Sequence, residues 1–312
     1  MNTAGDIARS LRDPVSQALR GLVAGRVEAA RNPADFVLVG LIGRGIQSSR
    51  SPAMHEREAA RLGLGCSYVL VDFDHLGLAD DALPAVLAAG AAAGFQGFNV
   101  THPFKQLIIP HLDALAPEAE AIGAVNTVVY ASGRTTGHNT DSWGFAESFR
   151  QDMPGVPLAR VVQFGAGGAG AAVAHALLGL GVAELVVIDS DPSRAESLAT
   201  RMRAMTGRAV RPGHDIGREV GEADGIVNTT PVGMAKYPGL PFPAELLLPR
   251  HWVAEIIYFP NETALLQLAR SMGCRSLSGM GMAVGQAARA FELFTGRKPD
   301  LLSMAGHFEA AA

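Results

Sequence analysis

Cysteine is scarce in this sequence of 312 residues, which contains only Cys66 and Cys274. Two cysteines far apart in the chain have neither the number nor the spacing of a disulfide framework or a zinc site. We therefore expect two free thiols, buried or partly buried, and no metal site.

Long apolar runs and clusters of basic residues are missing as well. No stretch reaches the ~20 apolar residues that a membrane helix needs, and the N-terminus lacks the apolar core of a signal peptide. The 26 basic and 30 acidic residues are spread along the chain and leave a formal net charge of −4. These absences argue against nucleic acid and membranes as partners and favour a cytoplasmic protein.

What is present fits a globular protein with more than one domain. Hydrophobic residues make up 48% and charged residues 18% of the chain, and its length exceeds that of a typical single core. Between residues 3 and 30, apolar residues at helical spacing predict one or two amphipathic helices in an N-terminal extension, residues 1–33. These residues are Ile7, Leu11, Val15, Leu19, Leu22 and Val23.

From Phe36 onward, short apolar runs alternate with helical patterns. The predicted strands are 36–42, 67–73, 97–100, 127–130 and 134–138, and the predicted helices are 52–62, 82–93 and 116–122. The last two strands read as a hairpin around Ser132 and Gly133. Strands that alternate with helices predict an α/β domain with a mainly parallel sheet covered by helices.

A second unit begins after a predicted helix at 142–151. Its predicted strands are 160–164, 184–189, 225–228 and 253–257, separated by helices that include 167–180 and 192–205. This rhythm is typical of a doubly wound, Rossmann-type nucleotide-binding domain. A long helix at 279–294 is expected to return to the first domain, which would make that domain discontinuous.

A glycine loop follows the first strand of this second unit and opens its first helix. Gly165 permits a tight turn, Gly167 lets the backbone approach a pyrophosphate, and Gly170 lets the helix pack close to the strand. The helix N-terminus supplies N–H groups and partial positive charge for the anion. We predict a dinucleotide-binding loop made of Gly165, Ala166, Gly167, Gly168, Ala169 and Gly170.

Asp189 closes the next strand, where an acidic residue usually binds the adenine ribose hydroxyls. A carboxylate there would repel a 2′-phosphate, so we predict NAD rather than NADP as the cofactor. Arg194 could stack on the adenine or pair with Asp191. The structural alternative for Asp189 is an N-cap of the helix that starts at Pro192.

Four short polar motifs precede the glycine loop, and each has an ordinary interpretation when it is taken alone. Ser51 could cap the helix that starts at Pro52, Lys105 could be a solvated surface lysine, and Asp141 could cap the helix that starts at Ser142. The motifs are Ser49-Arg50-Ser51-Pro52, Asn99-Val100-Thr101-His102-Pro103-Phe104-Lys105, Gly123-Ala124-Val125-Asn126-Thr127 and Gly137-His138-Asn139-Thr140-Asp141.

Taken together and in this order, the motifs resemble those of the shikimate dehydrogenase family. The resemblance runs from about Phe36 to the C-terminal end. Besides the polar motifs and the glycine loop, it includes Asn228-Thr229-Thr230-Pro231-Val232-Gly233-Met234, Tyr258-x-Pro260-x-x-Thr263, and Gly279 through Met282 to Gln286.

The resemblance implies a role for each of these motifs. Lys105 and Asp141 would be the catalytic pair in the reversible, nicotinamide-dependent oxidation of shikimate or quinate to the 3-keto acid. The substrate would be bound by Ser49, Ser51, Thr101, Asn126, Tyr258 and Gln286, and the cofactor by Gly165 to Gly170, Asp189, Arg194, Thr230 and Ala283. The domains would be 34–141 plus 280–312 for substrate and catalysis, and 142–279 for NAD.

Several residues indicate which branch of the family the chain resembles. Asp189-Ser190-Asp191 stands where NADP-type members carry Asn-Arg-Thr, and His102 and Pro52 to Glu56 resemble the NAD-preferring quinate/shikimate dehydrogenases. Ser142 and Glu255 depart from the glycine and aspartate of many members.

Two alternatives stay open at this point, an aminoshikimate or aminoquinate dehydrogenase and a cofactor-sensing regulator without turnover. A sensor needs neither Lys105 nor Asp141, so the presence of both residues counts against it. We expect a monomer or a homodimer.

Overall fold

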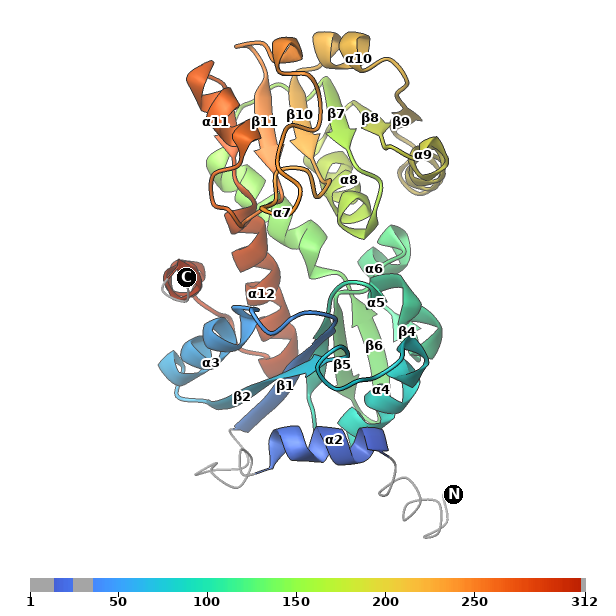
Figure 1. The fold of residues 1–312 in the computed structure, drawn as a ribbon, viewed down its shortest axis with the longest axis vertical. Coiled ribbons are helices and arrows are strands. Elements are labelled where there is room, and N and C mark those ends of the chain that lie inside the picture. Colours follow the sequence, from blue (N-terminus) through green and yellow to red (C-terminus); the bar gives the residue numbers. More distant parts are fainter. Residues whose placement is uncertain (1–13, 25–35, 310–312) are drawn as a thin grey trace. The chain divides into compact units, whose positions relative to one another are not determined.

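The computed structural model describes residues 14–24 and 36–309, and the chain forms two compact units (Figure 1). The first unit takes in the described residues up to Glu120, together with Ala124–Asn139 and the chain from Ala287 onward. The second unit contains Ala121–Gly123 and Thr140–Gln286. The main segment of the second unit thus begins at Thr140 and ends at Gln286. The sequence patterns predict that the second domain begins at residue 142 and ends at residue 279.

The first unit is built on a mixed sheet of six strands in the order β2-β1-β3-β5-β6-β4. Their bounds are β1 (Phe36–Gly43), β2 (Gly65–Asp72), β3 (Gly97–Val100), β4 (Ala114–Leu115), β5 (Thr127–Ala131) and β6 (Arg134–His138). β1 pairs in parallel with β2 and β3, while β5 runs antiparallel to both β3 and β6. The predicted β5–β6 hairpin is confirmed, and Ser132 (φ 51°) and Gly133 (φ 73°) form its turn with the positive φ angles that two-residue hairpin loops require.

Helices pack against this sheet, and a buried apolar cluster lies beneath them. They are α2 (Pro14–Val23), α3 (Ser51–Arg61), α4 (Leu83–Ala92), α5 (Phe104–Leu107), α6 (Pro117–Ile122) and α13 (Leu301–Glu309), with short 3₁₀ turns η2 (Asp80–Ala82) and η3 (Ile109–His111). Val15 and Leu19 of α2 are buried in this cluster, as their helical spacing predicts. The predicted helical residues Ile7 and Leu11 lie outside the described residues.

The second unit is built on a parallel sheet in the order β12-β11-β10-β7-β8-β9. The strands are β7 (Arg160–Phe164), β8 (Glu184–Ile188), β9 (Ala209–Pro212), β10 (Gly225–Asn228), β11 (Trp252–Glu255) and β12 (Arg275–Leu277). Counted along the chain, the order from β9 to β12 is 3-2-1-4-5-6, that of the dinucleotide-binding fold. The predicted two-domain α/β architecture is confirmed.

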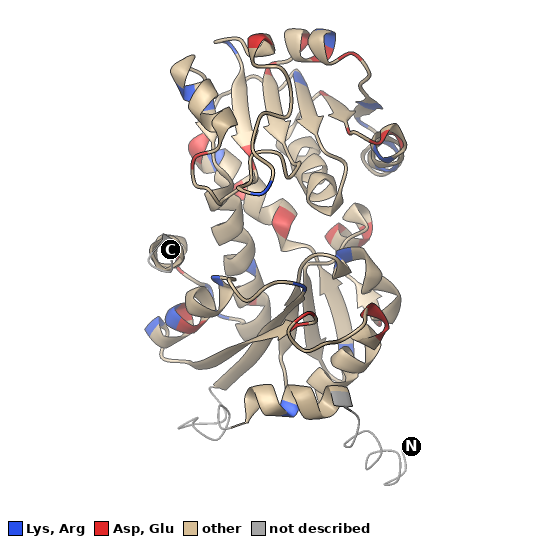
Figure 2. Cartoon of the chain, viewed as in Figure 1, with Lys and Arg blue, Asp and Glu red and all other residues tan. Residues whose placement is uncertain are grey.

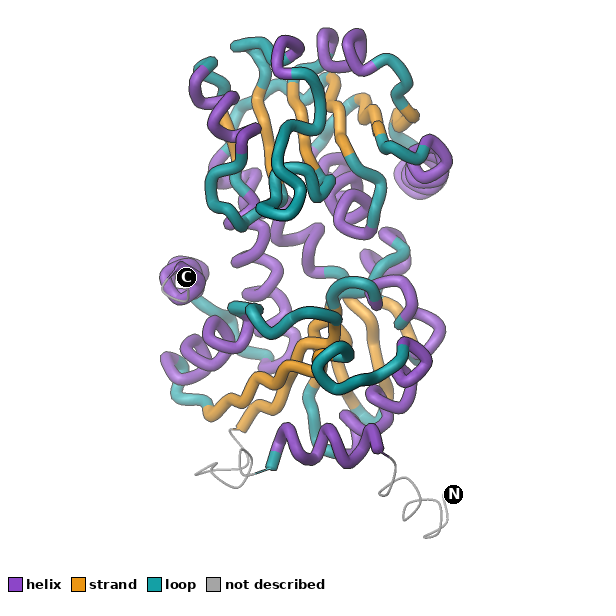
Figure 3. The backbone as a smooth tube through the Cα atoms, viewed as in Figure 1, coloured by secondary structure: helices purple, strands orange, loops and turns teal. Residues whose placement is uncertain are grey.

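Helices flank the strands of this second sheet (Figure 3). They are α7 (Thr140–Asp152), α8 (Gly168–Leu180), α9 (Pro192–Thr206), α10 (Ile216–Glu222) and α11 (Ala264–Ser271), with the 3₁₀ turn η4 (Ala244–Leu246). The long helix α12 (Gly279–Thr295) starts in this unit and ends in the first, where Ala290 and Phe294 pack with β1, as the sequence predicts. Because both faces are covered, the central strands are apolar throughout, and Val161, Val162 and Val186 are fully buried.

Glycines let α7 and α12 cross at close range within the second unit. A Cβ atom at Gly144 would lie 2.6 Å from the backbone nitrogen of Gln286, and one at Gly285 would lie 2.8 Å from the Cα of Gly144. Any side chain at either position would push the helices apart. This crossing brings the helix that carries Asp141 against the helix that carries Ala283 and Gln286.

Cys66 and Cys274 are both free, and Cys274 is buried, as predicted. None of the described helices is long and apolar enough to cross a membrane. Basic and acidic residues are interspersed over both units in the view of Figure 2, without a face of basic residues alone.

Candidate active site

Polar side chains of the predicted substrate site gather at one edge of the first sheet. The N–H of Thr101 donates to the carbonyl of Ile42 (2.9 Å), so Thr101 follows the end of β3 beside the end of β1. The N–H of Val100 donates to the carbonyl of Asn126 (2.7 Å), which fixes Asn126 at the same edge, just before β5. Open α/β sheets bind ligands at such strand ends.

Lys105 lies at this edge on the short helix α5. Its neighbour Phe104 is fully buried and packs against Phe73 with the two rings tilted and their centroids 4.4 Å apart. The carbonyl of Lys105 accepts a hydrogen bond from the N–H of Val125 (2.7 Å), next to Asn126. The backbone of Lys105 is therefore fixed on both sides, while its side chain is partly exposed.

The Ser49–Ser51 corner differs from its sequence-based interpretation. α3 begins at Ser51 itself, and the N-cap position falls on Arg50, whose side chain makes no capping bond. Ser51 is therefore not the N-cap. Ser49 Oγ instead accepts a hydrogen bond from the N–H of Ser51 (3.3 Å), so the two serines stay close together at the start of the helix.

Asp72, which the sequence motifs did not single out, organises the loop that leads to this corner. Its buried carboxylate accepts hydrogen bonds from the N–H groups of Gly45 and Ile46 and from Gln47 Nε2, each at 3.0 Å. Burial alone would raise the pKa of Asp72, but these donors hold it below its usual value. An aspartate at the end of the second predicted strand was the signal available in the sequence.

The glycine loop of the second unit has the geometry that a pyrophosphate requires. Gly165 has φ 103°, and a Cβ atom at Gly170 would lie 2.4 Å from the carbonyl oxygen of Gly165, so both positions need glycine. A Cβ atom at Gly167 or Gly168 would meet no protein atom within 4 Å. Packing therefore does not require glycine there, and the space above the uncapped N-terminus of α8 fits a phosphate group.

Asp189 lies beside this loop at the end of β8. Its carboxylate accepts hydrogen bonds from the N–H groups of Ala166 (2.7 Å) and Asp191 (2.9 Å). The N-cap of α9 is Asp191, which accepts from the N–H of Ser193 (3.0 Å), so the capping alternative for Asp189 is wrong. Arg194 lies 3.7 Å from Asp191 and forms the ion pair that was one of its two predicted contacts, the other being stacking on the adenine.

β10, which follows β7 in the sheet order, ends beside the glycine loop. Thr229 Oγ1 donates to the carbonyls of Phe164 (2.8 Å) and Gly165 (2.9 Å). Asn228 Oδ1 accepts from the hydroxyl of Thr230 (2.7 Å), which fixes the predicted cofactor residue Thr230. The loop and Thr230 thus flank the crevice at which the strand order reverses, where dinucleotides bind.

Comparison with known proteins agrees with this arrangement. Residues 41–128 match the substrate binding domain of shikimate dehydrogenase, and residues 279–305 match the C-terminal domain of shikimate 5′-dehydrogenase. A relative from Streptomyces avermitilis, named shikimate dehydrogenase (NADP(+)), is 56% identical over 255 residues, which cover 81% of this chain and 88% of the relative. The chain belongs to the shikimate dehydrogenase family.

Other relatives carry the other cofactor in their names. A quinate/shikimate dehydrogenase (NAD(+)) from Corynebacterium efficiens is 45% identical over 260 residues, 82% of this chain and 92% of the relative. The solved structure of quinate dehydrogenase from Corynebacterium glutamicum in complex with NAD has a TM-score of 0.85 and 45% identity, and it covers 88% of this chain and 99% of that chain. The predicted family is confirmed, whereas the preference for NAD stays a prediction.

The two departures from the family pattern both make specific contacts in the second unit. Ser142 Oγ lies 2.9 Å from His175 Nδ1, which links α7 to α8. Glu255 is fully buried and accepts hydrogen bonds from Asn228 Nδ2 (2.8 Å) and Thr263 Oγ1 (3.1 Å). Burial raises the pKa of the Glu255 carboxyl to about 8, so a proton is readily held between the ends of β10 and β11.

The predicted site residues divide between the two units. Ser49, Ser51, Thr101, Lys105 and Asn126 share one sheet edge in the first unit. The others belong to the second unit, namely Asp141, Gly165 to Gly170, Asp189, Arg194, Thr230, Tyr258, Ala283 and Gln286.

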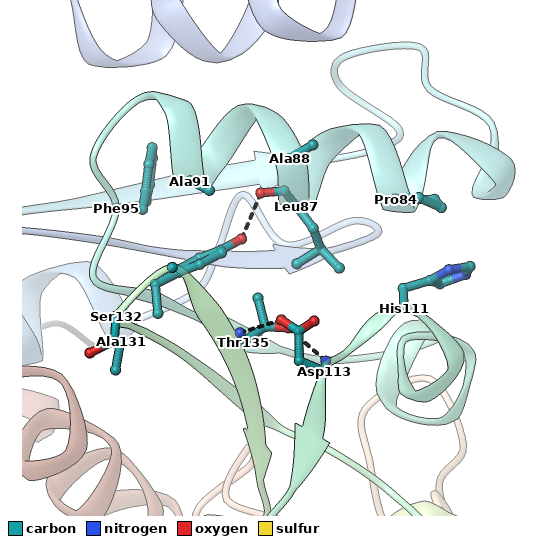
Figure 4. A pocket seen from close by; sticks show the side chains of 12 residues that line it. Pro84, Leu87, Ala88, Ala91, Phe95, His111, Asp113, Ala131, Ser132 and Thr135 are labelled. Carbon is teal, nitrogen blue, oxygen red and sulfur yellow. Dashed lines mark hydrogen bonds between the residues drawn. The ribbon is translucent and has the colours of Figure 1, made fainter. Parts of the chain in front are cut away.

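A separate cavity of about 460 Å³ lies between α4 and the β5–β6 turn of the first unit (Figure 4). None of the predicted site residues lines it. Within it, Tyr130 donates to the carbonyl of Leu87 (2.8 Å) and the Thr135 hydroxyl donates to Asp113. Because the predicted site residues lie elsewhere, we do not assign the active site to this cavity.

Proposed function

We propose that this chain catalyses the reversible oxidation of a ring secondary alcohol, in shikimate or quinate, to the 3-keto acid with a nicotinamide cofactor. The observation that carries the proposal is the gathering of Ser49, Ser51, Thr101, Lys105 and Asn126 at one sheet edge. This sheet edge offers hydroxyl groups that can bind a carboxylate. It also offers an amide and an amine that can bind ring hydroxyls. The first unit is the proposed substrate domain, and the second unit is the proposed cofactor domain.

Lys105 is the proposed acid–base group. The bound nicotinamide supplies the hydride acceptor, and the chain's own residues handle the proton. Lys105 Nζ takes the hydroxyl proton when neutral and returns it during reduction, and Asp141 supplies the carboxylate of the pair.

The test of this function is the absorbance of reduced nicotinamide in the presence of shikimate or quinate with NAD or NADP. Substrate-dependent reduction of either cofactor supports the proposal. A regulator that only senses the cofactor would bind the dinucleotide and show no substrate-dependent reduction.

Removal of the Ser51 hydroxyl is expected to weaken substrate binding. We propose that Ser49 and Ser51 hold the substrate carboxylate, and loss of a hydrogen bond to a charged group costs about 1.5–3 kcal/mol. Ser51→Ala should therefore raise KM for shikimate or quinate by roughly 10- to 100-fold, with KM for the cofactor unchanged.

The matched control for this substitution is Ser48→Ala, which removes an exposed hydroxyl from the same loop and should change neither constant. Because Ser51 does not cap α3, a loss of stability with an unchanged KM is not expected. That result would remove Ser51 from the proposed site.

Cofactor choice is expected to depend on Asp189. The carboxylate of Asp189 accepts hydrogen bonds from both ribose hydroxyls of NAD and repels the 2′-phosphate of NADP. We predict that kcat/KM with NAD exceeds that with NADP by at least about tenfold, or ~1.4 kcal/mol. Asp189→Asn combined with Ser190→Arg should shrink or reverse this ratio, and steady-state rates at matched pH measure it.

Asp191→Asn is the control, because it removes an acid from the same loop that caps α9 and should leave the cofactor ratio nearly unchanged. Asparagine at position 189 keeps an oxygen that can accept from the N–H of Ala166, so the loop should survive the change. Equal or better efficiency with NADP in the unmodified protein would show that Asp189 does not select the cofactor.

A further inference from the structure

A chain of buried side-chain hydrogen bonds crosses the first sheet from Tyr68 to Asn126. Ser51 interacts electrostatically with the hydroxyl of Tyr68, and that hydroxyl donates to Asn99 Oδ1 (2.8 Å). Asn99 Nδ2 donates to Thr127 Oγ1 (3.0 Å), and Thr127 Oγ1 donates to Asn126 Oδ1 (3.0 Å). The chain thus joins the carboxylate end of the proposed site to its hydroxyl end.

The direction of each bond follows from one backbone group. The carbonyl of Asn126 can only accept, and it lies 3.4 Å from the side-chain amide of Asn99, so the contacting atom is Nδ2. Asn99 Oδ1 must then accept from Tyr68. Because Asn99 also donates to Thr127, the single proton of the Thr127 hydroxyl is left for Asn126 Oδ1. An amide whose oxygen is held inward in this way directs its NH2 group to the opposite side.

Because these side chains are buried, breaking any of their hydrogen bonds is costly. Thr127 is fully buried, and Asn99, Asn126 and Tyr68 are nearly so. A buried polar atom that loses its partner destabilises the fold, because water cannot replace the lost hydrogen bond. Burial also raises the pKa of the Tyr68 hydroxyl well above its usual value, so it stays protonated and remains a donor to Asn99.

We propose that Tyr68, Asn99 and Thr127 form a positioning relay that fixes the Asn126 amide with its NH2 group toward the substrate. Asn126 then acts as a hydrogen-bond donor to a ring hydroxyl oxygen, and the relay selects ligands that present an acceptor at that position. The inference rests on the proposed function, because it specifies how one residue of that site is oriented.

Thr127→Val tests the relay, because valine keeps the shape of threonine and removes the proton that Asn126 Oδ1 receives. We expect KM for shikimate or quinate, and Kd measured by calorimetry, to rise by at least about fivefold, because the amide is no longer held in one orientation. The kcat and the KM for the cofactor should change by less than about twofold. Thr127→Ser keeps the hydroxyl and should restore substrate binding.

Asn126→Asp is the second variant and separates orientation from folding. Aspartate can still accept from Thr127 but presents an oxygen to the substrate in place of NH2, so it should also raise KM and Kd. Unchanged substrate affinity in Asn126→Asp would show that the amide oxygen faces the ligand, and it would overturn the relay.

The possible results separate the relay from the proposed function. An active wild-type enzyme with unchanged KM in Thr127→Val overturns the relay and leaves the function in place. A wild-type chain that neither binds nor oxidises shikimate and quinate overturns both. A lower melting temperature with unchanged affinity in Thr127→Val would mean that the hydrogen bonds serve folding alone.

Discussion

Replacement of Lys105 with alanine is expected to lower kcat by about two to four orders of magnitude, the usual contribution of general acid–base catalysis. The substitution removes the amine that takes and returns the substrate proton. Folding should be little affected, because the Lys105 side chain is partly exposed and the buried anchor of its helix is Phe104. Steady-state kinetics with either substrate, together with a thermal unfolding curve, measures both effects.

Gln106→Ala is the matched control, since Gln106 is an exposed neighbour on the same turn of α5. It should leave kcat within about twofold of the unmodified enzyme, the scale of a surface substitution. Near-normal turnover in Lys105→Ala would remove Lys105 from the chemistry.

Asp141→Asn should also lower kcat, because it keeps the shape of the side chain and removes its charge. The double variant Lys105→Ala/Asp141→Asn tests whether the two residues act as a unit. Residues that act together lose activity non-additively, so the double variant should be little worse than Lys105→Ala alone. Independent multiplication of the two losses would contradict the proposed pair.

Acid is expected to destabilise the fold through His55. His55 lies fully buried on α3, its ring centroid is 4.8 Å from that of Tyr68, and its Nε2 atom has no hydrogen-bond partner among the described residues. Burial lowers the pKa of the imidazole to about 3. The unfolded chain binds this proton more readily, so stability is retained above pH ~6.5 and falls as the pH drops toward 3.

The contribution of His55 to this loss is about 2 kcal/mol between pH 7 and pH 5. His55→Phe keeps a ring against Tyr68 and removes the titration, so its free energy of unfolding should fall less over the same interval, by about that amount. Denaturant unfolding at the two pH values measures the difference. His75→Gln, at an exposed position, should behave like the unmodified chain. An identical pH dependence in His55→Phe would mean that the imidazole is not the acid-sensitive group.

Features that depend on a few neighbouring residues could be predicted from the sequence. The glycine loop is set by local backbone geometry, and the alternation of buried strands with helices gave the two-domain α/β fold. The strands β4, β9 and β12 were missed, because they are short, lie at the edges of the sheets and are only partly buried, so their sequences carry little apolar pattern. The cap of α3 was also misassigned, since Arg50 already has helical dihedral angles and the helix starts one residue before Pro52.

The candidate site was predictable only where its residues belong to compact motifs. Lys105 and Asn126 were found in this way. The relay from Tyr68 through Asn99 to Thr127 was not predicted. Asn99 lies 31 residues from Tyr68 and 28 residues from Thr127, and only the folded sheet brings the three side chains together. Glu255 was noticed only as a departure, and its contacts with Asn228 and Thr263 depend on how β10 and β11 pair.

The interrupted connectivity of the first unit has a consequence for protein synthesis. Glu58 on α3 accepts hydrogen bonds from Arg61 and from the N–H of Asp300, 242 residues later in the chain. The guanidinium of Arg50 lies 5.1 Å from the ring of Phe308. The helix that starts at Ser51 thus acquires these partners only when residues 300–308 have left the ribosome, after the whole second unit has been made. The second unit can fold during translation before that point, whereas the helix at the serine corner must wait for residues 300–308.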